Sequence, residues 1–146
     1  MNPVPTVESQ PTNNFLCPAV SNGNPHEQAM IRRWWHETHG ARGCLVWEYF
    51  LNGLFADAVW FPDKDCVAIE EPGQRTARRF PLTDANVVLC EAKMKLTREL
   101  IGQALVYLWA AKRAGAHVRE TVVFAASDPF GIRPAAESLG LTVVLL

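Results

Sequence analysis

Apolar positions first recur at a helical period shortly after residue 23. Asn24 can cap a helix, Pro25 suits its first position, and Gly40 can end it after His39. At about 100° per residue, the apolar face of this helix comprises Met30, Ile31 and Trp34. Glu27 falls in the middle of that face. The pattern therefore predicts an amphipathic helix with a carboxylate on its buried side.

Two runs rich in β-branched and aromatic residues, 43–51 and 54–61, predict strands, and the Asn-Gly pair between them predicts a tight hairpin turn. A polar connection over 62–85 follows, long enough to be a working loop or to contain a short extra hairpin. A third strand is predicted over 87–93, where an apolar start leads into a charged end.

The rest of the chain alternates helical and strand patterns. A helix is predicted over 96–114, a buried strand over the apolar run 121–126, and a short helix ending near Gly140 before a last strand over 141–146. The order is α, β, β, β, α, β, α, β. A meander followed by a helical crossover to a parallel strand predicts an α/β fold with a mixed β-sheet flanked by helices.

Composition supports one folded domain. The chain has 146 residues, of which 49% are hydrophobic and 20% charged. Residues 1–23 carry several prolines among Asn, Ser and Thr, a composition typical of a flexible N-terminal arm. The domain is therefore expected over 24–146.

Charge and cysteine usage exclude several classes of function. Lys and Arg number 14 against 15 Asp and Glu, so a formal net charge of −1 excludes binding to polyanions by net attraction alone. The four cysteines form no Cys-x-x-Cys pair, which argues against zinc and iron–sulfur sites. Neither a charged, apolar leader nor a membrane span is evident, so a cytoplasmic protein with reduced thiols is expected.

Carboxylates at positions that the periodicity assigns to the interior indicate a site. Asp57 shares a strand face with bulky apolar residues, Glu91 shares a face with Lys93 on the third strand, and Glu27 lies on the apolar face of the first helix. A buried carboxylate is costly unless it is paired or binds a cation. One shared site for these acids is the economical interpretation.

These residues resemble the PD-(D/E)XK nuclease superfamily, which includes RecB-like nucleases and Holliday-junction resolvases. Asp57 resembles the isolated aspartate on the second strand of that family, and Glu91-Ala92-Lys93 resembles its Glu-x-Lys on the third. The remaining matches are Glu27 on the first helix and the Gln-x-x-x-Tyr pair Gln103 and Tyr107. Ala56 stands where a proline often precedes the aspartate. The resemblance covers about residues 24–146 and implies a restriction-endonuclease-like fold.

The resemblance implies a Mg²⁺-dependent DNA endonuclease that leaves 5′-phosphate and 3′-hydroxyl ends, with Mn²⁺ as a substitute. Mg²⁺ binds one or two carboxylates and keeps several waters, which suits Asp57 and Glu91, with Glu27 as a direct or water-mediated ligand. The family also implies the backbone carbonyl of Ala92 as a ligand. Lys93 can hold the attacking water and stabilise developing negative charge.

Contacts to DNA are expected mainly through its backbone. The expected phosphate contacts are Arg75, Arg78 and Arg79 in the long connection and Lys95 and Arg98 after the third strand. Gln103 and Tyr107 lie one helical turn apart and can project together toward the site. Alternatively, the cations are solvated surface, and Tyr107 is a core-edge aromatic beside a hydrogen-bonded Gln103.

Other interpretations remain open at this point. The same fold can serve as a catalytically silent or partner-dependent nucleic-acid-binding or assembly module, and the same chemistry can cleave RNA. Trp34 and Trp35 are not expected to be buried together on one narrow helix face, and Val106 and Trp109 lie opposite the apolar arc of their helix. Exposed aromatics predict a homodimer or a partner protein.

Overall fold

The computed structural model describes residues 24–65 and 80–146. Its elements follow the predicted order: α1 (Pro25–His39), β1 (Cys44–Leu51), β2 (Leu54–Phe61), β3 (Asn86–Ala92), α3 (Arg98–Arg113), β4 (His117–Ala125), α4 (Arg133–Ser138) and β5 (Thr142–Leu145). The predicted N-terminal arm, the predicted DNA contacts Arg75, Arg78 and Arg79, and any extra hairpin over 66–79 lie outside the described residues. Among the described residues, no helix is long and apolar enough to cross a membrane.

The five strands form one sheet in the order β1-β2-β3-β4-β5. β1 to β3 pair antiparallel, as expected for a meander, and β4 and β5 join parallel to β3. The sheet is therefore mixed. Because α3 connects β3 to the adjacent parallel strand β4, the carboxyl ends of these two strands lie at the same edge of the sheet.

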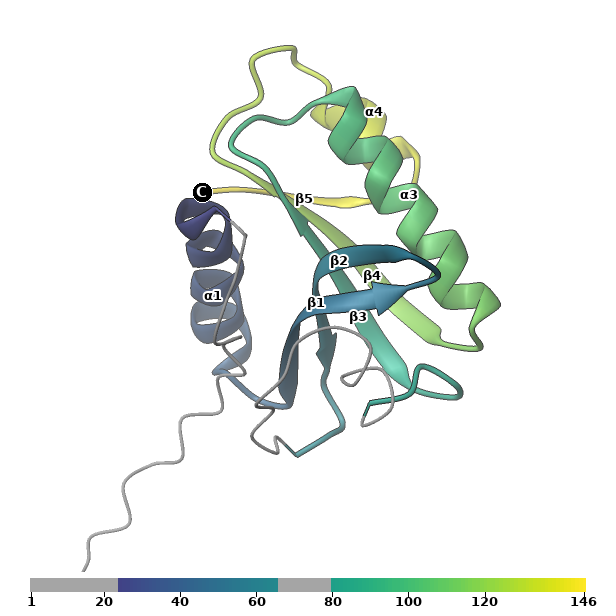
Figure 1. Ribbon diagram of the computed structural model, residues 1–146. Helices are drawn as coiled ribbons and strands as arrows, with labels where there is room; N and C mark the ends of the chain where they lie inside the picture. Colours follow the sequence, from purple (N-terminus) through teal and green to yellow (C-terminus); the bar gives the residue numbers. More distant parts are fainter. Residues whose placement is uncertain (1–23, 66–79) are drawn as a thin grey trace, which may run out of the picture.

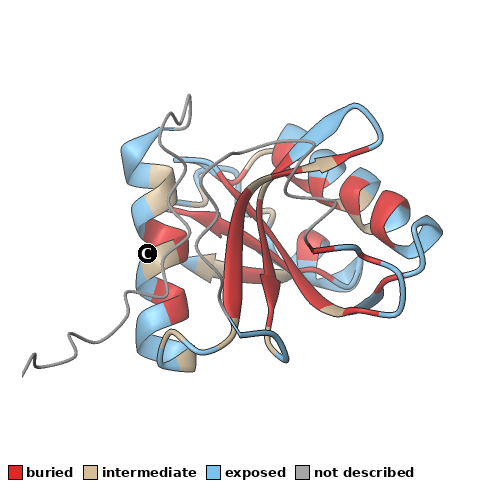
Figure 2. Ribbon diagram, turned by 60° about the horizontal axis from the view of Figure 1, so that its bottom comes forward, coloured by how far each residue is buried: buried red, intermediate tan, exposed pale blue. Residues whose placement is uncertain are grey.

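Helices cover both faces of the sheet, with α1 on one side and α3 and α4 on the other (Figure 1). The inner helix faces and the central strands are the buried parts of the molecule (Figure 2). Trp34 of α1 packs edge-on against Trp60 of β2 and Phe124 of β4, with ring centroids 5.7 Å and 5.3 Å apart. The predicted α/β fold with a mixed, helix-flanked sheet is confirmed.

The first helix has the predicted ends, but its burial differs from the expectation. The Asn24 side chain accepts a hydrogen bond from the His26 N–H, and Gly40 adopts the left-handed conformation as the C-cap. The expectation that Trp34 and Trp35 are not both buried is wrong, since they are 7% and 0% exposed. The chain after the helix folds back, so the Trp35 indole N–H donates to the Arg42 carbonyl at 2.8 Å.

Candidate active site

Asp57 and Glu91 meet where strands β2 and β3 separate. The paired residues of these strands end at Ala58 and Cys90. Beyond this last pair, carboxylate side chains replace backbone carbonyls as the acceptors. The Asp57 N–H donates to Glu91 Oε1 at 2.9 Å, and the Ala92 N–H donates to Asp57 Oδ2 at 2.8 Å. A hydrogen bond also links the two carboxyl groups. The acids therefore occupy the split between the strands.

Burial makes this carboxyl pair hard to ionise. Glu91 is 3% exposed, and burial together with the negative charge of Asp57 raises its pKa to about 9. Burial also raises the pKa of Asp57, against the lowering effects of the Ala92 N–H and the Lys93 charge. Two carboxyls in contact cannot both carry a charge cheaply. Near neutral pH the pair therefore retains a proton unless a positive charge replaces it.

Lys93 and Glu27 stand beside this pair. Lys93 follows the last residue of β3, and its Nζ lies 3.9 Å from Glu27 Oε2 on the first turn of α1. The Lys93 charge lowers the pKa of both Asp57 and Glu91, whereas the Glu27 charge raises that of Asp57. The structure thus brings together three predicted acids and the predicted lysine.

Of the predicted Gln-x-x-x-Tyr pair, Tyr107 is buried within reach of the charges of the two acids. Tyr107 on α3 is 8% exposed, and burial followed by the charges of Glu91 and Asp57 raises its pKa to about 12. Its hydroxyl therefore stays protonated near neutral pH and can donate a hydrogen bond. Gln103 is exposed one turn earlier, and within the described part of the chain no hydrogen bond joins it to the two carboxyls. Its place in the site stays a prediction.

Glu48 is an acid near the site that the sequence analysis did not select. It stands opposite Asp57 in the register of β1 and β2, where regular pairing is interrupted, and its φ of 49° is left-handed. A small pocket is lined by Asn24, Glu27, Gln28, Ile31, Glu48 and Asp57. A carboxylate between apolar neighbours in a predicted strand was the available signal, the same one that singled out Asp57.

Of the cations expected to contact DNA, two lie among the described residues. Lys95 and Arg98 are exposed just after the site. Two arginines of α1, which are not among the expected contacts, have partners within the protein: Arg33 pairs with Glu37 at 3.1 Å. The Arg32 guanidinium lies over the Trp47 ring, 5.3 Å from its centroid. Contact of Lys95 and Arg98 with DNA stays a prediction.

The donor set of the carboxyl pair fits a hard divalent cation. Among residues 24–65 and 80–146, no group of three or more His, Cys, Asp or Glu side chains is arranged to hold a metal ion. Mg²⁺, however, binds through one or two carboxylates and keeps several waters. Asp57 and Glu91 are hydrogen-bonded to each other, and a binding cation displaces such a proton. Further ligation by Glu27 and by the Ala92 carbonyl stays a prediction.

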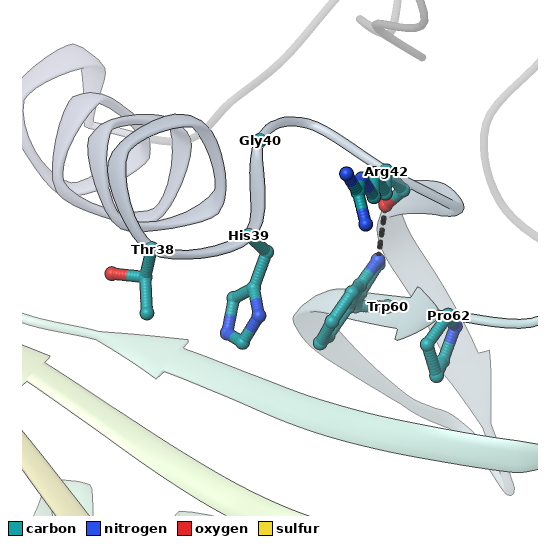
Figure 3. Close-up of a pocket in the computed structure, with 6 residues that line it drawn as sticks. All are labelled: Thr38, His39, Gly40, Arg42, Trp60 and Pro62. Carbon is teal, nitrogen blue, oxygen red and sulfur yellow. Dashed lines mark hydrogen bonds between the residues drawn. The ribbon is translucent and has the colours of Figure 1, made fainter.

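A wider pocket of about 500 Å³ lies at the other end of α1 (Figure 3). Its wall includes Trp60, whose indole N–H donates to the Arg42 carbonyl at 2.7 Å, and His39, whose ring centroid lies 4.3 Å from that of Trp60. At 1.5 Å per residue, α1 separates His39 from Glu27 by roughly 18 Å. Neither Asp57 nor any other predicted site residue lines this pocket, so it is separate from the candidate active site.

Comparison of the chain with protein-family models, with curated proteins and with solved structures finds no match.

Proposed function

We propose that this protein is a Mg²⁺-dependent DNA endonuclease with a restriction-endonuclease-like fold, which hydrolyses phosphodiester bonds to 5′-phosphate and 3′-hydroxyl ends. The observation that carries the proposal is the convergence of Asp57, Glu91, Lys93 and Glu27 from three separate elements. The order of elements, with Glu-x-Lys at the end of β3, supports the resemblance to PD-(D/E)XK nucleases.

In this proposal each side chain has a distinct task. Asp57 and Glu91 hold the cation, which when bound supplies positive charge beside the phosphate and lowers the pKa of water. Lys93, with its side chain 48% exposed, reaches solvent and stabilises negative charge that develops on the phosphate. Glu27 restrains the Lys93 ammonium at 3.9 Å. The Tyr107 hydroxyl, protonated at neutral pH, serves as a hydrogen-bond donor at the buried side.

A substrate panel tests the proposal. Labelled duplex, branched and single-stranded DNA and RNA are incubated with the protein in Mg²⁺, and the ends are identified by phosphatase and ligase treatment. We expect cleavage of DNA to ligatable 5′-phosphate ends. Glu91→Gln and Lys93→Met should each lower the rate by about 100-fold or more, because each removes charge needed in the transition state.

Lys112→Ala provides the matched control. Lys112 is an exposed cation in the last turn of α3 and has no part in the candidate site. This variant should cleave at the wild-type rate, and circular dichroism should show all variants folded. Cleavage by the double variant Glu91→Gln/Lys93→Met at the wild-type rate would falsify the proposal.

One observation favours a second candidate, a nucleic-acid-binding or assembly module without hydrolytic activity. One oxygen of each carboxyl already accepts a backbone N–H, so the pair also serves to close the split between β2 and β3. Calorimetric titration with Mg²⁺ and Mn²⁺ separates the two candidates. Absence of both cation binding and cleavage would favour the module, whereas cleavage of RNA alone would redirect the proposal to a ribonuclease.

A further inference from the structure

Two loops leave the carboxyl ends of the parallel strands β3 and β4, beside the candidate site (Figure 1). They comprise residues 93–97 and 126–132, here called the loop platform. The Leu96 N–H donates to the Ser127 carbonyl at 2.9 Å, and Lys95 forms a parallel bridge with Ser127. These backbone contacts join the two loops into one unit.

The tip of the platform is a turn fixed by Asp128. Its carboxylate accepts the backbone N–H groups of Ile132 and Arg133, both at 3.0 Å, and the Gly131 N–H donates to the Asp128 carbonyl at 3.3 Å. Phe130 lies in this turn and is 67% exposed, more than any other large apolar residue in the described ranges. The turn therefore holds a flat apolar ring out in solvent.

Positive charge accompanies the exposed apolar surface. Met94 is 40% exposed between Lys93 and Lys95, and Arg98 is exposed one residue beyond the platform. The Asp128 carboxylate accepts hydrogen bonds from backbone N–H groups, which offset its negative charge. A partner that fits this surface must offer flat apolar faces together with negative charges.

Resting on the proposed function, we propose that the loop platform binds unpaired nucleotides of the substrate strand. Their bases stack on Phe130 and pack on Met94, while Lys95 and Arg98 contact the phosphates. Unpaired nucleotides present both base faces and phosphates, and aromatic side chains with nearby cations bind single strands in this way. A regular duplex hides its base faces in the stack. The preferred substrates therefore carry unpaired bases beside the cleaved phosphate.

Binding without cleavage tests this inference. Fluorescence anisotropy in EDTA compares a labelled single strand with a blunt-ended duplex of the same strand length. Phe130→Ala should weaken single-strand binding about tenfold and leave duplex binding unchanged, since one stacking contact is lost. Phe130→Trp should retain affinity, whereas Phe130→Leu should behave as the alanine variant if the flat ring matters. Leu139→Ala, at a site that is 54% exposed after α4, is the control and should bind as wild type.

The outcomes separate this inference from the proposed function. Equal loss on both ligands, no loss in Phe130→Ala, or no binding of a single strand by the wild-type protein overturns the inference. If the wild-type protein binds single strands through Phe130 but cleaves nothing in Mg²⁺, the platform stands and the hydrolytic proposal fails. If the protein cleaves duplex DNA and Phe130→Ala binds every ligand normally, the hydrolytic proposal stands and the platform fails.

Discussion

At the residue scale, the contact between Asp57 and Glu91 controls what the candidate site can do. Both carboxyls accept hydrogen bonds from backbone N–H groups where β2 and β3 separate. Burial at this position raises the pKa of each carboxyl. An ionised pair there lowers the stability of the metal-free fold. Such an arrangement is typical of functional sites, where a bound cation supplies the missing positive charge.

The raised pKa of Glu91 predicts that the metal-free protein loses stability at high pH. Its folded pKa of about 9 lies above its ordinary value, so the native state binds more protons than the unfolded state between these values. The stabilisation is full below the unfolded pKa and is lost as pH rises toward about 9. Urea unfolding in EDTA at pH 5 to 9 should show a loss of several kcal/mol, since each unit of pKa shift corresponds to about 1.4 kcal/mol.

Glu91→Gln removes this titration, so its stability should fall less steeply with pH than that of the wild-type protein. A wild-type stability that rises between pH 5 and 9, or identical slopes for the two proteins, would contradict the assigned pKa shift.

Glu48 provides a second test at this scale. Because its φ is 49°, a residue with a Cβ is strained there, whereas glycine is not. Glu48→Gly and Glu48→Ala both remove the carboxylate, yet the glycine variant should be about 1 kcal/mol more stable in urea unfolding. Equal stability of the two variants would show that the left-handed backbone at this position relaxes. Reduced cleavage by both variants, measured on folded protein, would add Glu48 to the site.

At the element scale, the connections between elements hold the site in place. The chain passes tightly from α1 into β1 at Gly43, which has a φ of 71°. A Cβ there would lie 2.5 Å from the Phe61 carbonyl oxygen and 2.8 Å from Pro62 Cα, both backbone atoms at the end of β2. In contrast, a Cβ at Gly102 on the exposed side of α3 meets no atom within 4 Å.

These two glycines predict opposite effects of the same substitution. Gly43→Ala should destabilise the protein by about 2 kcal/mol or more, because backbone must move and φ is unfavourable. Gly102→Ala should stabilise it by about 0.5–1 kcal/mol, because alanine restricts the unfolded chain and favours the helix. Thermal unfolding measures both effects, and a stabilised Gly43→Ala variant would contradict the close approach.

At the scale of the whole molecule, the sheet brings the site residues together at one edge. Glu27 comes from α1, Asp57 from β2 and Glu91 from β3, and Lys93 directly follows β3. On the outer side of α3, Val106 and Trp109 are 48% and 58% exposed, as the sequence predicts. A homodimer or a partner protein bound there stays a prediction.

Cation binding at this edge should stabilise the whole fold. At 100 times the dissociation constant, Mg²⁺ adds about 2.7 kcal/mol, which raises the Tm by roughly 5–11 °C. The increase should be larger at pH 8 than at pH 6, because binding displaces the proton of the carboxyl pair. Differential scanning fluorimetry measures the shift. The Tm of Glu91→Gln should rise little when Mg²⁺ is added. A rise equal to that of the wild-type protein would show that the cation binds elsewhere.

The sequence by itself determined the order of the elements and singled out the carboxylates and the lysine of the candidate site. The helix from Pro25 to His39 and the first two strands form as predicted, because caps, turn residues and apolar periods act locally. Local patterns predict the ends of a strand less well where polar residues alternate with apolar ones. The fourth strand was predicted only from Thr121, yet it begins at His117 because it pairs with β3 along that length.

Only the tertiary structure decided how these residues meet. Asp57 and Glu91 are 34 residues apart, and their contact depends on the point at which β2 and β3 separate, which no local pattern reports. The burial of Trp35 likewise depends on the chain folding back to Arg42. Periodicity assigns a side chain to a face, but register and the divergence of strands determine which distant group it touches.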